Sequence, residues 1–547
     1  MRTGNASWLA AILTVLGVSL AACTSATTES TTTTSTAGGG GDVGATTTLG
    51  DSGQGEGDGQ QGGVLKVGHT TDVVGFHPDL YASAQDRDVI TNIYDTLVEY
   101  DLRNYDLVPS LAEDWSVSED GLTWTFNLRQ NVVFHDGSEL DADDVVASIA
   151  RASEPQAGRT EGLLTRIEEV VAVDDSTVEI RLSEPDRVLL STLADVYVSP
   201  DDSSIDLAEN PVGTGPFQLE EWEPNQFILL ERNEGYWRDG LPYLDGIRFV
   251  INPELNVLAV QLRTGEIDLL YEAPLSEMGP LQTAGMQLIP PDRVFSIFNM
   301  YVNSRNTPWD SEAVRQAASY AIDREAISAA LFGFMEVRSN PLEPLENADS
   351  PEADFFAEDA LSYNQRDLEK AQQLLADAGY ADGVDGGEMI ICSVAGFHFT
   401  TMGQLIQSQL AEVGIDVSIT PIPDGPTWAS RTFQDRAGEF DLSLCGQGAK
   451  PDPYDLVNHT YAKFWTEPLG WIDENPSFYE DLDAARSIVD EEEYRATILD
   501  LQTQALEGQP NILLGGRPVF VAAQPYVKDF IAHTQAHMFF TEVWLDQ

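Results

Sequence analysis

Hydrophobic and polar residues alternate along the first half of the folded chain, as they do in half-buried strands. The alternation is clearest in LTWTFNLRQNVVFHDG (122–137), VVAVDDSTVEIRL (170–182) and FQLEEWEPNQFILLERN (217–233), which carry turn residues between their apolar runs. A first strand is expected in VLKVGHTTDV (64–73), followed by a helix over QDRDVITNIYDTLVEYD (85–101). The pattern predicts a mixed, mostly antiparallel first lobe.

The periodicity changes near residue 300, where apolar residues begin to recur at helical spacing. Residues 311–332 and 367–380 are expected to form amphipathic helices, and 491–508 a longer helix. Between residues 388 and 446 the apolar runs EMIICSV, IDVSITPI and EFDLSLCG alternate with two helical patterns. This βαβαβ order predicts a parallel sheet with right-handed crossovers, so the second lobe should be α/β.

The stretch FHDGSELDADDVV (134–146) contains one histidine and five carboxylates, which suggests either a metal site or a helix start. Asp141 stands where a helix N-cap is expected, with its carboxylate accepting from the amide of Asp144 or its neighbour. Asp143 and Asp144 would then lie in the first turn, where negative charge complements the helix dipole. We therefore predict a structural role for these carboxylates.

The chain has 547 residues, which is too long for one simple core and indicates two or three lobes. It carries 90 acidic and 29 basic residues, a net charge of −61. Nucleic-acid binding depends on Lys and Arg, so this charge excludes a nucleic-acid partner. The acidity is spread along the whole chain, which favours a solvated surface, as in a saline habitat, over a site for cationic ligands.

The first residues, MRTGNASWLAAILTVLGVSLAAC, combine a basic start with an apolar run from Trp8 to Leu20. That run is shorter than the roughly 20 residues needed to span a bilayer, so we interpret it as a secretory signal. The ending LAAC resembles a bacterial lipobox, which would make Cys23 the lipidated residue that follows the signal peptide of residues 1–23. An ordinary signal peptide with an incidental cysteine is the alternative. The lipobox predicts a protein anchored to the membrane rather than spanning it.

Residues 24–63 are rich in Thr, Ser and Gly and cannot bury apolar surface, so they should be a disordered tether. About 40 flexible residues give an end-to-end distance of about 35 Å. The tether would hold the folded body off the bilayer while keeping it nearby.

Two further cysteines, Cys392 and Cys445, lie in runs that are expected to be buried strands of one sheet. An exported compartment permits a disulfide between them, and two separate buried thiols are the alternative. The sequence has no zinc-type cysteine spacing. His533 and His537 lie where strands are expected, so we predict no metal site there.

Seven stretches, taken together and in order, resemble the extracytoplasmic solute-binding proteins of ABC transporters, in the large peptide/nickel-binding family 5. They are LVPSLAEDWSVSEDGLTWTFNLRQNVVFHDGSELDADDVVASI (107–149), NPVGTGPFQLEEW (210–222), ERNEGYW with LPYLDGIRF (231–249), LRTGEIDLL (262–270), AVRQAASYAIDREAI (313–327), EKAQQLLADAGY (369–380) and QSQLAEVGIDV (407–417). The resemblance covers nearly all of residues 64–547.

The resemblance implies an α/β, two-lobe periplasmic-binding-protein-like fold of class II, the large type with an extra lobe I subdomain. Lobe I would comprise residues 64–298 and a C-terminal return at 518–547, and lobe II residues 299–517. Residues 298–304 and the chain around Arg517 would form the hinge.

Gly213 and Gly215 in NPVGTGPF suggest a phosphate-binding loop, but the Lys-Ser/Thr ending of such a loop is missing. We therefore interpret this stretch as a tight structural turn.

The implied function is that of a transport receptor, which captures a small solute, a peptide above all, and delivers it to the permease and ATPase subunits of an ABC importer. It would be a monomer on the outer face of the cytoplasmic membrane, with no cofactor and no catalytic group. An oligosaccharide or another non-peptide ligand, a sensory role and an exported hydrolase are the alternatives. The hydrolase is disfavoured because the chain lacks Gly-x-Ser-x-Gly and His-Glu-x-x-His.

In peptide binders of this family, an aspartate that follows Gly-Trp in lobe II pairs with the peptide amino terminus. Here Gln447 stands in place of that tryptophan, and no acid precedes Asp452, which we expect in a turn. A buried ammonium without a carboxylate is costly, and an inward Lys450 would add to the cost. No arginine that would clamp a dipeptide carboxylate is evident near residues 393–401. Strict dipeptide binding is therefore disfavoured, whereas longer peptides and oligosaccharides remain as candidate ligands.

Aromatic residues beside polar groups suit a ligand pocket, although each aromatic alone also suits a core. His398 is expected at a strand-to-helix turn, on the side where open α/β sheets bind ligands. The candidate ligand-binding residues are Tyr81, Phe397, His398, Trp428, Gln447, Lys450 and Trp465.

Overall fold

The computed structural model of the protein describes residues 59–80, 84–154, 164–291, 294, 296–338, 355, 365–392, 398–422, 425–433, 439–448, 452–461, 469–517, 519–532 and 538–547. The chain divides into an N-terminal unit ending at Gln54 and one unit from Gly55 to Gln547, which holds every element below. The predicted signal segment with Cys23 and most of the predicted tether lie outside the described residues.

The folded body includes residues before the expected start at Val64. The amide of Gly62 donates to the carbonyl of Tyr243 at 2.8 Å, and the amide of Gly63 donates to the carboxylate of Asp245 at 2.8 Å. Because these bonds fix the backbone, the last residues assigned to the tether belong to the folded body.

Lobe I is built on a seven-stranded sheet with the order β12-β18-β11-β1-β10-β9-β8. Its strands are β1 (Val64–His69), β8 (Phe217–Glu223), β9 (Phe227–Arg232), β10 (Gly246–Ile251), β11 (Leu269–Leu270), β12 (Gln287–Ile289) and β18 (Val521–Ala523). The central strand β1 pairs in parallel with β10 and β11, and the other pairs are antiparallel. The mixed, mostly antiparallel sheet predicted for the first lobe is therefore confirmed.

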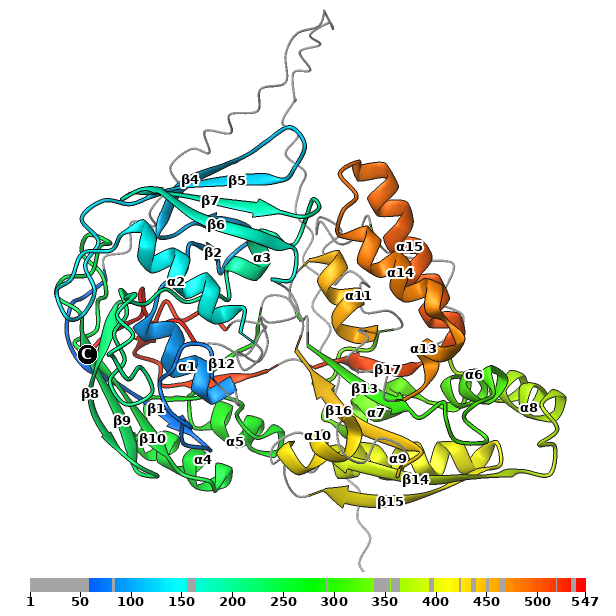
Figure 1. Cartoon of the computed structure of the whole chain (residues 1–547). Helices are drawn as coiled ribbons and strands as arrows, with labels where there is room; N and C mark the ends of the chain where they lie inside the picture. The colour runs from blue at the N-terminus through cyan, green and yellow to red at the C-terminus, as the bar shows by residue number, and fades with distance from the viewer. Residues whose placement is uncertain are drawn as a thin grey trace, which may run out of the picture. The chain divides into compact units, whose positions relative to one another are not determined.

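A second sheet, with the order β4-β5-β7-β6, is antiparallel throughout. Its strands are β4 (Ala112–Val117), β5 (Thr123–Leu128), β6 (Ile167–Asp174) and β7 (Thr177–Leu182). Helix α2 (Ala142–Ala152) packs against β6 and β7, as Figure 1 shows. Nearby lie the hairpin of β2 (Val98–Tyr100) with β3 (Leu107–Pro109) and the short helix α3 (Leu189–Leu193).

The start of α2 settles the role of the acidic stretch that precedes it. Asp141 is the N-cap, and its carboxylate accepts from the amides of Asp143 at 2.9 Å and Asp144 at 3.3 Å. The carboxylate of Asp144 in turn accepts from the amide of Asp141 at 2.9 Å, which completes a capping box. The predicted structural role is confirmed.

The lobe II sheet has the order β15-β14-β16-β13-β17. Its strands are β13 (Ile297–Val302), β14 (Val384–Cys392), β15 (Ile415–Ile422), β16 (Leu442–Gln447) and β17 (Asn511–Gly516). The predicted βαβαβ unit forms a parallel set, since β14 pairs in parallel with both β15 and β16. The sheet as a whole is mixed, because β13 joins β16 and β17 in antiparallel fashion.

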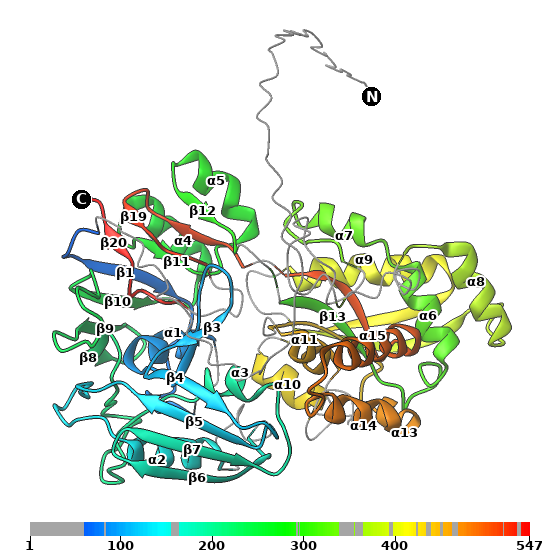
Figure 2. The same cartoon turned by 90° about the horizontal axis from the view of Figure 1, so that it is seen from above.

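The other helices are α1 (Ala84–Ile93), α4 (Leu255–Thr264), η1 (Leu275–Glu277), α5 (Met278–Thr283), α6 (Glu312–Ala321), α7 (Arg324–Ala330), α8 (Leu368–Asp377), α9 (Phe399–Glu412), α10 (Gly425–Phe433), α11 (Pro453–Tyr461), α13 (Trp471–Glu474), α14 (Pro476–Ala485) and α15 (Glu491–Gly508). The C-terminal strands β19 (Val527–Lys528) and β20 (Trp544–Leu545) return to lobe I, where Figure 2 shows them near β1. Within the described ranges no helix is long and apolar enough to cross a membrane.

Two helix predictions need correction. The single helix expected over 311–332 is two helices, because the side chain of Asp323 accepts from the amide of Ala326 at 2.9 Å and starts α7. The helix expected over 85–101 ends at Ile93, because the following residues turn into strand β2 and pair with β3.

The glycines of NPVGTGPF are explained by close packing against the end of α1. A Cβ atom on Gly213 would lie 2.1 Å from the carbonyl oxygen of Ile93, and one on Gly215 would lie 2.6 Å from it. The amide of Gly215 donates to this same oxygen at 2.9 Å. The interpretation as a structural turn is confirmed.

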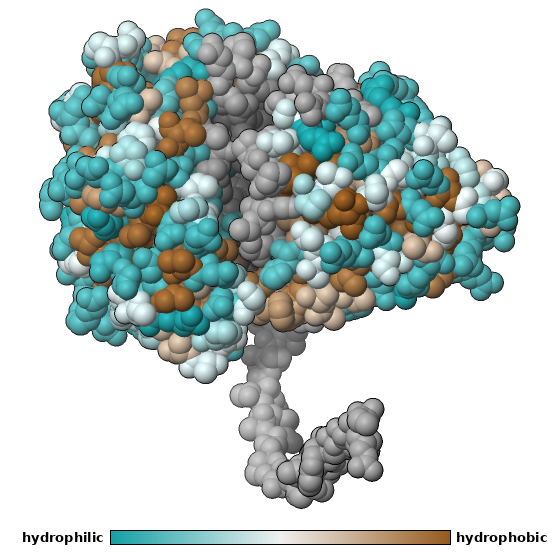
Figure 3. All heavy atoms as spheres, turned by 90° about the horizontal axis from the view of Figure 1, so that it is seen from below, coloured by the Kyte–Doolittle hydropathy of each residue, from teal (hydrophilic) through white to brown (hydrophobic). Residues whose placement is uncertain are grey.

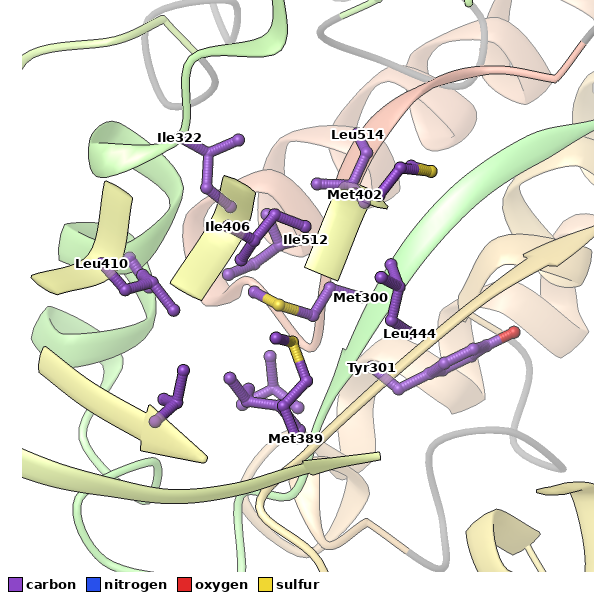
Figure 4. Packing of buried hydrophobic residues seen from close by; sticks show 14 of the residues in the cluster. Met300, Tyr301, Ile322, Met389, Met402, Ile406, Leu410, Leu444, Ile512 and Leu514 are labelled. Carbon is purple, nitrogen blue, oxygen red and sulfur yellow. The ribbon is translucent and has the colours of Figure 1, made fainter. Parts of the chain in front are cut away.

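Lobe II is held together by an apolar core between its sheet and the helices that cover it. Figure 4 shows Met300 of β13 and Leu444 of β16 packed near Met402 and Ile406 of α9, and all four are fully buried. Burying an aliphatic side chain stabilises a fold by about 1.5–3 kcal/mol. By contrast, Figure 3 shows mostly hydrophilic residues on the face that it presents, as the charge of the chain leads one to expect.

Candidate functional site

The chain crosses twice between the sheets of the two lobes. The first crossing leads from β12 to β13, and the second leads from β17 to β18. The two crossings are tied together, because the amide of Arg517 donates to the carbonyl of Ser296 at 2.7 Å. Arg517 therefore stands at the junction of the lobes.

A buried pair of opposite charges lies at this junction. The carboxylate of Glu272, just after β11 in lobe I, is 3.8 Å from the guanidinium of Arg517, and their side chains are only 18% and 13% exposed. Burial raises the pKa of Glu272 to about 7, Arg517 acts to lower it, and Asp88 raises it further. Glu272 also has a φ of 51°, in the left-handed region that residues other than glycine rarely adopt.

On the lobe II side, the side chain of Arg517 packs against Gly446. A Cβ atom at Gly446 would lie 2.9 Å from the Cδ atom of Arg517, so this close approach requires glycine. Gly446 is the second-last residue of β16, beside the carboxyl end of the parallel strand β14. In open α/β sheets, ligands bind outside the carboxyl ends of such strands. Glu272 and Arg517 thus border the edge at which a ligand is expected.

Cys392 and Cys445 lie next to each other at this edge. The parallel register pairs Ile391 with Leu444, which brings the following residues of the two strands side by side. Both cysteines are buried free thiols, so the structure contains no disulfide between them. Burial raises the pKa of the Cys445 thiol, and its hydrogen bond with Cys392 acts in the same direction. The two strands are adjacent, as predicted, and the structure contains two thiols rather than a disulfide between Cys392 and Cys445.

The predicted ligand residues are only partly described. His398 precedes α9, is half-buried and lies with its ring centroid 6.1 Å from that of Phe332. Trp428 belongs to the lobe II core, where its indole nitrogen donates to Ser443 at 2.9 Å, which matches the core alternative. The backbone of Gln447 ends β16 opposite Ile297. The remaining candidates, Tyr81, Phe397, Lys450 and Trp465, lie outside the described residues, as do His533 and His537.

Asp452 precedes α11, where we expected a turn. Its carboxylate accepts from the amide of Asp455 at 3.1 Å, so it caps the helix. Burial raises the pKa of Asp452 to about 7, and the neighbouring Asp455 raises it as well. The carboxylate of Asp455 accepts from the hydroxyl of Ser191 in lobe I at 3.2 Å.

The lobes meet again at residues 183–191 of lobe I and 483–491 of lobe II, which we call the interlobe seam. At its centre the Arg486 guanidinium donates to the Asp186 carboxylate at 3.1 Å and 2.5 Å, and the two side chains are 5% and 1% exposed. Next to this pair, the amide of Arg187 donates to the carbonyl of Arg486 at 2.9 Å. The guanidinium of Arg187 donates to Glu491 at 2.6 Å.

An apolar cluster supports the seam from both sides. It contains Tyr105 and Val188 of lobe I together with Tyr454, Leu482 and Tyr494 of lobe II. The seam therefore combines buried charge with apolar packing, unlike an incidental surface contact.

Neither Glu272 nor the seam residues are predicted from the sequence. The one signal for Glu272 in the sequence is a charged residue that follows a buried apolar run. Many surface turns share this signal. Asp186 and Arg486 are 300 positions apart, so their pairing has no local signature.

The two lobes have separate sheets and are joined by two crossings beside the carboxyl ends of parallel strands. This arrangement defines a two-lobe binding protein of the periplasmic type. Residues 106–468 match the family model of bacterial extracellular solute-binding proteins, family 5. The chain belongs to this family, as its seven stretches suggested.

The relatives agree with this assignment. The dipeptide-binding protein of Escherichia coli strain K12 is 28% identical over 505 residues, which cover 84% of this chain and 90% of that protein. Heme-binding protein A of Haemophilus influenzae is 28% identical over 422 residues, covering 70% and 74% of the two chains.

A solved structure, the ABC transporter-associated periplasmic binding protein DppA from Helicobacter pylori in complex with peptide STSA, has a TM-score of 0.75 and 25% identity. The match covers 89% of this chain and 99% of that one. The protein is thus an extracytoplasmic solute-binding protein of an ABC transporter, which works with permease and ATPase subunits. It is a binding protein and not an enzyme.

Proposed function

We propose that the protein captures a peptide between its lobes and delivers it to the permease of an ABC importer. The observation that carries this proposal is the pair of Glu272 and Arg517 at the junction, 3.8 Å apart and largely buried. A free peptide is a zwitterion, and this site offers it one carboxylate and one guanidinium. Relatives named for a dipeptide or solved with a peptide support the same class of solute.

The peptide is longer than a dipeptide in this proposal. The chain has no acid between Gly446 and Asp452, and Asp452 itself is engaged in capping α11. A strict dipeptide binder must fix both charged ends at a set distance, whereas a longer peptide is held largely through its backbone.

The domain limits from the resemblance remain part of the proposal: lobe I at 64–298 with a return at 518–547, and lobe II at 299–517. Strands β1 to β12 and β18 to β20 support the first lobe, and β13 to β17 support the second. The hinge would lie at the two crossings, around Arg517 as expected but before residues 298–304, because β13 (Ile297–Val302) is paired on both sides within the lobe II sheet. Solute would shift the balance toward the closed state through its better contacts there.

We further propose that Cys23 carries a lipid and that the tether holds a monomeric body at the outer face of the membrane. The apolar run before Cys23 and the low-complexity stretch after it support this. Replacing Cys23 by Ser should release the protein from the membrane fraction and abolish incorporation of labelled palmitate. Membrane retention of the variant would contradict the anchor.

Native mass spectrometry of the protein purified gently from its host, beginning after Cys23, tests the ligand. Co-purified masses of peptides a few residues long are expected. Masses of sugars or metal chelates would overturn the peptide proposal and assign the protein another solute. Small-angle scattering should show a monomer that compacts when the identified solute is added.

A further inference from the structure

We propose that Glu272 is the carboxylate that holds a positively charged amino group of the bound solute. The inference rests on the proposed function and specifies the chemistry of its site. Glu272 lies outside the lobe II loop at 446–452, so the negative charge opposite the amino group would come from lobe I.

The carboxylate of Glu272 is largely buried, with its side chain 18% exposed, and it has few partners. In the described part of the chain it accepts no hydrogen bond, and its one ion pair, with Arg517, is 3.8 Å long. Buried charged groups are normally both paired and hydrogen-bonded, because leaving them unsatisfied is costly. The carboxylate is therefore open to a further donor.

The neighbouring Tyr271 shows the same deficit. Its side chain is 5% exposed, and its hydroxyl oxygen is buried without a hydrogen-bond partner among the described residues. Burial raises the pKa of Tyr271, and the charges of Glu272 and Asp88 act in the same direction. A second polar group without a partner in the described part of the chain therefore lies one residue before Glu272.

The backbone supports a functional reason for this arrangement. Glu272 holds a φ of 51°, which costs free energy for a residue with a side chain. Such strain persists where the surrounding structure fixes it, and it is concentrated at ligand clamps. If this turn had no other role, glycine at this position would make the fold more stable, because glycine adopts a positive φ at little cost.

A primary ammonium group suits this carboxylate. It has three N–H donors and a positive charge, so it can donate to the Glu272 carboxylate and offset its charge. The site also lies on the correct side, because Arg517 reaches from Glu272 to Gly446 at the edge of the lobe II sheet. A peptide α-amino group or a lysine side chain has this chemistry.

The test compares amine-bearing and amine-blocked peptides on the soluble protein that starts after Cys23. Equal amounts of a casein digest and of the same digest acetylated with deuterated acetic anhydride are added together, and bound masses are counted by native mass spectrometry. The wild type should bind the free-amine forms at least about 30-fold in preference, as expected for a buried charge pair. Glu272→Gln should reduce the preference to near unity.

The matched control is Glu266→Gln, which removes the same charge at an exposed position shortly before β11 and should retain the full preference. Urea unfolding of each variant confirms that it folds. Equal binding of both digests to the wild type, or an unchanged preference in a folded Glu272→Gln, would overturn the inference and leave the peptide proposal intact. Binding of neither digest to the wild type would overturn the peptide proposal and this inference with it.

Discussion

Replacing Asp186 by Asn removes the charge at the centre of the interlobe seam while keeping the shape of the side chain. The Asp186 carboxylate accepts two hydrogen bonds from Arg486, and it also accepts from the amide of Val188 at 3.2 Å. The amide oxygen of Asn, in the place of Oδ1, can keep the bonds from the Arg486 Nε and the Val188 amide, so only the bond to Oδ2 is lost. The variant therefore reports chiefly on the loss of a buried negative charge opposite a buried guanidinium.

The magnitude follows from the burial of the pair. Removing one partner of a buried ion pair costs about 3–5 kcal/mol, because the other charge is left uncompensated. Since Asn still accepts two of the three bonds, we expect the low end, about 3 kcal/mol. Asp186 belongs to lobe I and Arg486 to lobe II, so this energy favours the arrangement in which the seam is formed over one in which water reaches both groups. A loss of this size shifts the ratio of these two arrangements by about 100-fold.

Small-angle scattering measures the shift, as an increase in the radius of gyration of the unliganded Asp186→Asn variant relative to the wild type. The double variant Asp186→Leu, Arg486→Leu should return toward the wild type, because apolar replacement of a whole buried pair is often neutral. Glu491→Gln, which breaks the exposed pair with Arg187, should change little, by under about 1 kcal/mol. An unchanged radius together with an unchanged urea midpoint in Asp186→Asn would refute the reasoning.

Three further outcomes are expected. The affinity of the wild type for amine-bearing peptides, divided by that of Glu272→Gln, should rise between about pH 6 and about pH 7.5, because burial raises the pKa of Glu272 to about 7 and only the ionised carboxylate attracts an ammonium. Titration calorimetry of both proteins measures this ratio, in which the titration of the peptide amino group at about pH 8 cancels. Arg517 and Asp88 act on the side chain at position 272 in both proteins, and a ratio that stays constant over this range would contradict the prediction. Asp141→Ala should lower the free energy of unfolding by about 1 kcal/mol through the lost N-cap, and a urea midpoint equal to that of the wild type would contradict this. Gly213→Ala should yield little folded protein in circular dichroism, because its Cβ atom would lie 2.1 Å from a carbonyl oxygen at the end of α1; a normally folded variant would show that the turn can yield.

The sequence is a good guide to the fold where the pattern is local. Strands β14, β15 and β16, with the helices between them, follow from alternating apolar runs and helical periodicity, and the cap at Asp141 follows from spacing alone. The break at Asp323 was missed because the helical periodicity continues across it, and only the cap geometry marks it. The antiparallel attachment of β13 and β17 is a long-range pairing that no local pattern specifies.

The site was harder to predict than the fold. His398 lies at the strand-to-helix turn where we expected it, but Trp428 lies in the core, since an indole satisfies a core and a pocket equally well. Glu272 gains its significance from Arg517, which comes from the other crossing of the chain. Such a pairing depends on tertiary structure, so residue type and spacing could not reveal it.

The position of β18 bears on how the molecule is assembled after export. This strand lies between β12 and β11 in the lobe I sheet, pairing with Ile289 on one side and Leu270 on the other. During synthesis and translocation, lobe II is continuous and emerges complete before β18 does. The lobe I sheet, although it starts at Val64, stays split at this place until the last part of the chain arrives. The lobe whose strands come first is therefore completed last, and until then the edge of β11 is open to pairing with another strand.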